Sequence, residues 1–214
     1  MATTSQGWGL AEEGRSEEGL VQIRQGLTAY RATREELGVS SYLILQADAY
    51  GKTGNFAEGY NSFAEAREFI RNTEERFWEA ELYRLYGELT LRQESQNVTI
   101  KTQKSKFSKP TSHILEPEAE AEECFHKAIE IARRQQAKSF ELRAAVSLAR
   151  LWRHQGKQDQ THQLLAELYD WFTEGFDTKD LQEAKSLLTA LSRQSVPEPA
   201  LPEMAGQETS PPNL

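Results

Sequence analysis

The sequence predicts an all-α fold, in which antiparallel helix pairs stack into a solenoid of about eight helices. A small, large, small pattern at helical spacing recurs four times along the chain, and a glycine stands at a fixed distance before it in three of those copies. No run of residues shows the alternation that is typical of a half-buried strand. A repeat with a period of roughly 20 to 50 residues is typical of stacked, repeated units.

The recurring pattern consists of a small residue, a large residue four positions later, and a small residue three positions after that. On a helix these spacings place all three side chains on one stripe, where the small residues let a neighbouring helix approach and the large one fills the gap. The four copies are Gly19, Ile23 and Gly26; Gly59, Phe63 and Ala66; Ala121, Phe125 and Ala128; and Thr161, Leu165 and Leu168, the last of which has the same spacing but ends in leucine. The stripe therefore predicts a helix-packing face in each copy.

The spacing of the copies predicts one insertion. They start at positions 19, 59, 121 and 161, so the first and last intervals are equal and the middle one is longer. The difference predicts an insertion of roughly 22 residues. The preceding helices align at the same intervals through Ala47, Gly87 and Ala149, so the insertion lies between Gly87 and the third stripe. The segment 94–117 is rich in Thr, Ser and Lys and contains two prolines, and we predict that it is an inserted basic loop.

The individual helices follow from the stripes and from the residues at their ends. The acidic pairs at 12–13, 17–18, 74–75 and 122–123 fall at helix starts or on exposed faces, where they favour the helix dipole. Gly38, Gly54 and Gly156 suit the left-handed position that closes a helix, and Tyr50 and Trp152 each stand four residues before such a glycine. The expected helices span 16–36, 40–52, 56–72, 76–93, 117–136, 138–155, 159–173 and 178–192.

The second copy carries a resemblance to a known family. An aromatic residue is followed by a glycine four positions later, by a second aromatic residue and then by the stripe. This pattern resembles a tetratricopeptide repeat, although the period in this chain is longer than the usual length of about 34 residues. The residues that carry the resemblance are Tyr50, Gly54, Phe56, Gly59, Phe63 and Ala66. The family implies a right-handed superhelix whose members bind other proteins. The other packing residues expected from the pattern are Gly87, Ala121, Phe125, Ala128, Trp152, Gly156 and Leu165.

A closer resemblance covers about residues 7–192. The stretches 7–33, 47–59, 121–157 and above all WFTEGFDTKDLQEAKSLL at 171–188 are similar to the C-terminal repeat region of predicted bacterial ATPases. Those proteins often carry a class III adenylate or guanylate cyclase domain at the N-terminus. The resemblance implies a cytoplasmic, non-catalytic interaction or regulatory module of a bacterial signalling protein.

The sequence departs from this family at three places. The segment 94–117 is longer and more basic than a short turn, and Gly19 and Gly26 replace the usual alanines. Residues 1–15 leave only a truncated or frayed partner for the first helix. We therefore expect a repeat domain over 16–192, a disordered proline-rich tail over 193–214, and a chain that is a fragment or detached tail of a larger protein.

Composition excludes several other classes. The formal net charge of −8 disfavours a general affinity for nucleic acid, which depends on Lys and Arg displacing counterions. The single cysteine, Cys124, permits no internal disulfide, and the first residues lack the basic and apolar regions of a secretory signal. No run of about eighteen apolar residues predicts a membrane span. These observations favour a cytoplasmic protein.

Catalytic motifs are also missing from the sequence. Gly51, Lys52 and Thr53 spell GKT, but Gln46 occupies the position where a phosphate-binding loop requires glycine. The four histidines lack the HExxH spacing of a zinc site. Cys124 has no neighbouring histidine that would activate it, and we interpret it as a small hydrophobic residue. We therefore predict no catalytic residue, no metal ligand and no cofactor, and expect that the chain is not an enzyme by itself.

The remaining candidate is a binding groove on the concave side of the solenoid. Arginines on two of the helices that line it offer planar, bidentate donors for carboxylates. These are Arg84, Arg92, Arg143, Arg150 and Arg153. The groove is expected to bind a protein or peptide segment, including an acidic segment or the free carboxyl terminus of a partner. The alternative is a solvated face on which Arg84 is paired with Glu81 and Glu88.

Two further hypotheses stay open at this point. In the part of the predicted loop over 96–115, four lysines at 101, 104, 106 and 109 stand near Phe107 and offer a weak contact for nucleic acid or an anionic membrane surface. The chain is alternatively a detached part of an ATPase or nucleotide cyclase whose catalytic domains lie elsewhere.

Overall fold

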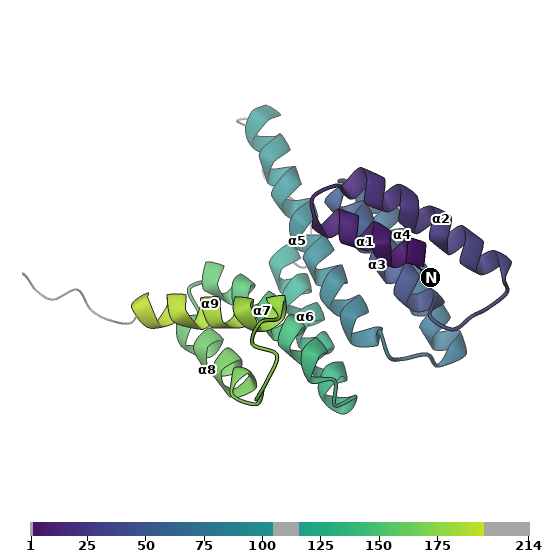
Figure 1. The fold of residues 1–214 in the computed structure, drawn as a ribbon. Coiled ribbons are helices and arrows are strands. Elements are labelled where there is room, and N and C mark those ends of the chain that lie inside the picture. The colour runs from purple at the N-terminus through teal and green to yellow at the C-terminus, as the bar shows by residue number, and fades with distance from the viewer. Residues whose placement is uncertain (1, 105–115, 195–214) are drawn as a thin grey trace, which may run out of the picture.

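The computed structural model describes residues 2–104 and 116–194. Within these ranges the chain forms nine α-helices and no strand, which confirms the all-α prediction (Figure 1). The helices are α1 (Ala2–Glu12), α2 (Ser16–Ala32), α3 (Val39–Lys52), α4 (Phe56–Thr73), α5 (Glu79–Lys104), α6 (Pro117–Arg134), α7 (Lys138–His154), α8 (Gln158–Tyr169) and α9 (Lys179–Gln194).

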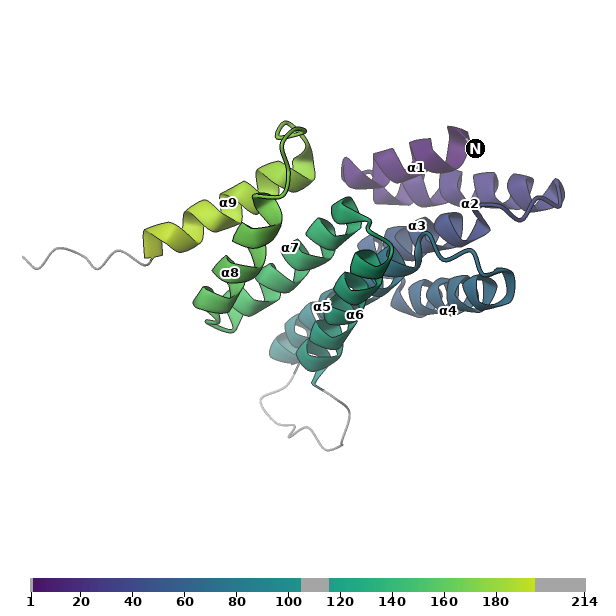
Figure 2. The same ribbon diagram turned by 90° about the horizontal axis from the view of Figure 1, so that it is seen from below.

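Each helix packs against the next one along the chain. The odd-numbered helices also contact one another in sequence, since α1 contacts α3, α3 contacts α5, α5 contacts α7, and α7 contacts α9. Figure 2 shows the resulting progression from α1 and α2 at one end to α8 and α9 at the other. The odd-numbered helices therefore form a continuous row through the molecule.

The four stripes are buried between helices. Phe63 and Phe125 are 1% and 0% exposed, and the small residues beside them are also buried. Gly87 of α5 faces Phe125 of α6, because a Cβ atom at Gly87 would lie only 2.8 Å from Cε1 of that ring. A large residue on one helix thus packs against a residue without a side chain on its partner. Tyr50, Phe56 and Trp152 are only half-buried.

The two helices that precede Gly54 and Gly156 end in the same way. The backbone N–H of Asn55 donates to the carbonyl oxygen of Tyr50, and the N–H of Lys157 donates to that of Trp152, both at 2.9 Å. Gly54 and Gly156 stand between them with φ of 78° and 77°. These bonds satisfy carbonyls that a helix end otherwise leaves unpaired. Gly38 also has a positive φ, but it lies directly before α3 rather than at the end of α2.

The N-terminal helix corrects an expectation from the sequence. The sequence predicts that residues 1–15 give only a truncated partner for the next helix, whereas α1 has 11 residues. It approaches α2 closely, because a Cβ atom at Gly7 would lie 2.7 Å from the carbonyl oxygen of Gly19. Gly7 stands as far before Ala47 as Ala47 stands before Gly87, so the sequence contained a signal for this helix.

The second correction concerns the predicted loop over 94–117. Helix α5 continues through Lys104, because no glycine or proline interrupts the sequence between Gly87 and Pro110. The hydroxyls of Ser95 and Thr99 donate to backbone carbonyls four residues earlier and remain compatible with the helix. Residues 105–115, with three of the residues of the predicted basic contact, lie outside the described residues, as does the tail from 195. In the part of the chain that is described, no helix is long and apolar enough to cross a membrane.

Candidate binding groove

A groove of about 710 Å³ runs along the row of odd-numbered helices. Its lining side chains come from α1, α3, α5, α7 and α9, together with Trp78 immediately before α5. None comes from an even-numbered helix. The stripes place the even-numbered helices on the other side of this row, because their large residues face the odd-numbered helices. The packing pattern therefore determines which helix faces line the groove.

The groove follows the periodicity of the sequence. Ser5, Leu45 and Leu85 line it at equal intervals, which match the interval between the first two stripes, and Ser147 follows at the longer interval of the middle stripes. Trp8, Asp48, Glu88 and Arg150 form a second row with the same intervals. Equivalent positions of successive helices therefore face the same space. The side chains at those positions differ in size and charge, so the groove offers a different surface along its length.

The structure brings together four of the five arginines expected in the groove. Arg84, Arg92, Arg143 and Arg150 line it, whereas Arg153 lies near the end of α7 with its side chain exposed elsewhere. The apolar part of the lining includes Leu45, Leu85, Val146 and the aromatic rings of Trp8, Tyr42 and Trp78. Sequence reasoning missed this apolar part, although the repeat spacing of Leu45 and Leu85 was a signal for it.

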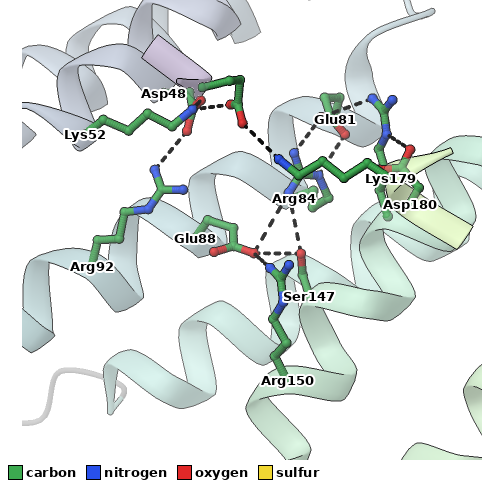
Figure 3. A network of polar contacts seen from close by, with 12 residues as sticks. Asp48, Lys52, Glu81, Arg84, Glu88, Arg92, Ser147, Arg150, Lys179 and Asp180 are labelled. Atoms are coloured by element: carbon green, nitrogen blue, oxygen red, sulfur yellow. Dashed lines mark hydrogen bonds and ion pairs between the residues drawn. The ribbon is translucent and has the colours of Figure 1, made fainter. Parts of the chain in front are cut away.

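Arg84 lies at the centre of the charged part (Figure 3). Its Nε and Nη2 atoms donate to the carboxylate of Glu81 at 2.8 and 2.6 Å, and its Nη1 lies 3.9 Å from Glu88. The side chain is 16% exposed. Burial by itself lowers the pKa of Arg84, but the carboxylates of Glu81 and Glu88 outweigh it and raise the pKa, so the guanidinium stays charged. The Ser147 hydroxyl completes the cluster by donating to Glu88 at 2.7 Å.

Arg143 and Arg150 connect α7 with its neighbours on both sides. Arg143 donates from Nε to Asp180 of α9 at 2.7 Å, and its Nη1 lies 3.8 Å from Glu81 of α5. Arg150 contacts Glu183 of α9 and lies 3.4 Å from Glu88 of α5. These pairs join three consecutive odd-numbered helices across the groove.

Asp48 is the centre of a second cluster nearer the N-terminal end. Its carboxylate accepts from Arg92 of α5 at 2.8 Å and pairs with Lys52 at 2.7 Å, while its side chain is 3% exposed. Burial alone raises the pKa of Asp48, but the charges of Lys52 and Arg92 outweigh burial and hold the pKa below its ordinary value. Lys52 also pairs with Glu12 of α1, whose second oxygen lies 3.4 Å from Nζ of Lys179 on α9.

The charges that line the groove balance. Six cationic and six carboxylate side chains are among its lining residues. Every lining arginine has a carboxylate partner, so the pairing of Arg84 with Glu81 and Glu88, which the sequence left as an alternative, is present. Sequence reasoning missed Asp180 and Glu183 as partners, because they lie far beyond Arg143 and Arg150 along the sequence, on a separate helix.

The residues that were candidates for phosphate binding, thiol chemistry or metal binding occupy structural positions. Lys52 of the GKT sequence is the last residue of α3 and pairs with carboxylates, whereas a phosphate-binding lysine lies at the start of a helix. Burial, together with Glu120 and Glu123, raises the pKa of the Cys124 thiol to about 11. Over the described residues, no group of three or more His, Cys, Asp and Glu side chains could hold a metal ion.

Comparisons with known proteins do not assign the chain to a family. No protein-family model matches it, and no curated protein matches it significantly.

Proposed function

We propose that this protein is a tetratricopeptide-type interaction module that binds a segment of a partner protein in the groove, without catalysis of its own. One observation carries the proposal: equivalent positions of successive odd-numbered helices line a single groove of about 710 Å³. Stacked helix pairs form extended concave surfaces of this kind, which suit an extended peptide or a partner helix. A cytoplasmic regulatory role, coupling a bound protein to a catalytic domain elsewhere, is part of the same proposal.

The lining specifies the chemistry of the partner segment. The apolar side chains of the partner segment pack against Trp8, Leu45 and Trp78, which line the groove and are not buried. Its acidic side chains contact Arg143 and Arg150, which are 35% and 43% exposed and therefore more accessible than Arg84. Because these arginines already have carboxylate partners, an acidic segment must exchange with Asp180 and Glu183. We infer an amphipathic segment rather than a purely acidic one.

The proposal is tested by site-specific photocrosslinking with the full-length protein. A photoreactive phenylalanine derivative replaces Trp8, which lines the groove and is 37% exposed. The matched control carries it at Trp171, which is 58% exposed and lies outside the groove. We expect a discrete protein to crosslink at position 8 and not at position 171, and Arg143→Ala with Arg150→Ala to reduce its yield. A protein that crosslinks only at position 171 would exclude the groove as the binding site.

A further inference from the structure

A second, smaller hollow lies between α4 and α5 and has an excess of positive charge. Its volume is about 140 Å³, and it shares no lining residue with the groove. Arg67 and Arg71 of α4 and Arg76 of the connection to α5 line it, together with Glu79 and an apolar wall that includes Ile70 and Leu82. The lining thus holds three guanidinium groups and one carboxylate, in a protein whose formal net charge is −8.

The internal ion pairs of the hollow are weak. Arg76 lies 3.6 Å from Glu79, and Arg71 lies 3.6 Å from Glu68, a carboxylate that does not line the hollow. Arg67 makes no ion pair with any of the described residues. Arg67 and Arg71 are also four residues apart on one helix, where like charges repel each other. Arg71 and Arg76 each have one distant carboxylate partner, and Arg67 has none among the described residues.

The next copy of the pattern provides an internal comparison. Arg133, Lys138 and Glu141 stand at the positions equivalent to Arg71, Arg76 and Glu79, with the same offset that separates Phe125 from Phe63. In this later copy the Glu141 carboxylate accepts from Arg133 at 2.6 Å and from Lys138 at 2.7 Å and is 3% exposed. We call this copy closed, because its carboxylate is paired with both cations, and the earlier copy open. In the earlier, open copy Glu79 has one cationic partner, at 3.6 Å.

The third arginine has no counterpart in the closed copy. The position equivalent to Arg67 is occupied there by Ile129, which is buried. The open copy thus has one more cation than the closed copy and a looser carboxylate. An anion supplied from outside would complete it, as Glu141 completes the closed copy.

We propose that the hollow between α4 and α5 binds a phosphate group through Arg67, Arg71 and Arg76. Guanidinium groups bind phosphate oxygens through paired, charge-assisted hydrogen bonds. A volume of about 140 Å³ is well below the roughly 300 Å³ of the smallest pockets for drug-sized ligands. The hollow therefore holds the phosphate group alone, and any molecule that carries it extends into solvent.

The test is a titration of the full-length protein with inorganic phosphate, followed by its backbone amide resonances in solution. Ionic strength is held constant by exchanging chloride for phosphate at about pH 7.5. We expect saturable shifts confined to residues 67–83. Arg67→Ile, which installs the residue of the closed copy, and Arg71→Gln should each weaken binding by about fivefold or more. Arg133→Gln, in the closed copy, is the matched control and should leave the affinity unchanged.

Phenyl phosphate, a phosphate ester, distinguishes the two sources of the phosphate group, which are the free ion and a larger molecule that carries it. Binding of inorganic phosphate alone assigns the site to the free ion, while binding of both ligands assigns it to a phosphate ester as well. The proposal is overturned if the shifts are linear in phosphate concentration, or if Arg67→Ile and Arg71→Gln both retain the affinity of the parent. The amide spectra of the variants also report whether each variant remains folded.

Discussion

The α1–α2 and α5–α6 pairs carry equivalent stripes but fill them differently. At α1–α2, glycines occur on both helices, and a Cβ atom at Gly7 would lie 2.7 Å from the carbonyl oxygen of Gly19 and 2.9 Å from the backbone nitrogen of Ile23. At α5–α6, Gly87 faces the ring of Phe125, which is fully buried. In the α1–α2 pair the backbones of the two helices come close to each other at Gly7, and in the α5–α6 pair the ring of Phe125 packs against the backbone at Gly87.

The difference teaches that one spacing pattern serves two kinds of interface. The stripe fixes which face of a helix is buried, while the size of its residues sets how closely the two axes approach. The α5–α6 pair combines one large ring with a residue that has no side chain, whereas the α1–α2 pair depends on the absence of side chains at several positions. The α5–α6 pair is therefore tested by removing volume and the α1–α2 pair by adding it.

The largest expected effect is at the α5–α6 pair. Phe125→Ala should lower the free energy of unfolding by about 3–5 kcal/mol, because it removes a fully buried ring and leaves a cavity against Gly87. Urea denaturation followed by circular dichroism measures the change. The control is Phe77→Ala, whose ring is 63% exposed and which should change stability far less. Equal effects of the two substitutions would contradict the packing role of Phe125.

Helix α3, which lies between the α1–α2 and α5–α6 pairs, is joined to α5 by the buried carboxylate of Asp48. Asp48→Asn should lower the free energy of unfolding by about 3 kcal/mol near pH 7, since it leaves Lys52 and Arg92 without their buried partner. The folded-state pKa of Asp48 lies below its ordinary value, so its stabilisation is present above the unfolded-state pKa of about 3.9 and is lost as pH falls through the folded-state pKa.

The stability difference between the parent and Asp48→Asn should therefore be constant above about pH 6 and shrink in acid. Denaturation series at several pH values measure it. Asp180→Asn is the control, because that carboxylate is 33% exposed and should contribute only about 0–1 kcal/mol. A difference that persists unchanged at the lowest pH would show that the charge of Asp48 is not the source of its effect.

The α1–α2 pair is tested by two glycines of the same helix. Gly7→Ala should destabilise the protein by about 1–3 kcal/mol, because the added methyl group meets the backbone of α2. Gly9→Ala should instead stabilise it by about 0.5–1 kcal/mol, since nothing lies within 4 Å of its Cβ position and alanine favours the helix. Thermal unfolding gives both signs. Two stabilising substitutions would mean that α1 does not pack closely on α2.

The smallest effect concerns the thiol beside Phe125. A pKa of about 11 leaves Cys124 almost entirely protonated near pH 7.5, so iodoacetamide should alkylate it at least about tenfold more slowly than it alkylates glutathione. The reaction is followed by mass spectrometry. In concentrated guanidinium chloride the rate should rise to that of an ordinary thiol. A rapid reaction in the folded protein would contradict the partial burial of this thiol.

Sequence reasoning predicted the buried faces better than the ends and partners of the helices. The stripes around Phe63 and Phe125 were predictable, because small and large residues at helical spacing are a local pattern. The extension of α5 was missed because polar composition alone does not end a helix. The pairing of Arg143 with Asp180 was missed because it depends on how two helices that are distant along the sequence are placed in space.

The contact of Glu12 with Lys179 has a consequence for cooperativity. It joins residues near opposite ends of the sequence, so the first helix touches the last one as well as α3. In an array whose units contact only their neighbours, unfolding starts at either end independently. Here the opening of one end removes a contact from the other. Because Lys179 is 81% exposed, salt weakens this link. We therefore expect fraying of the two ends to be correlated at low ionic strength and independent at high ionic strength.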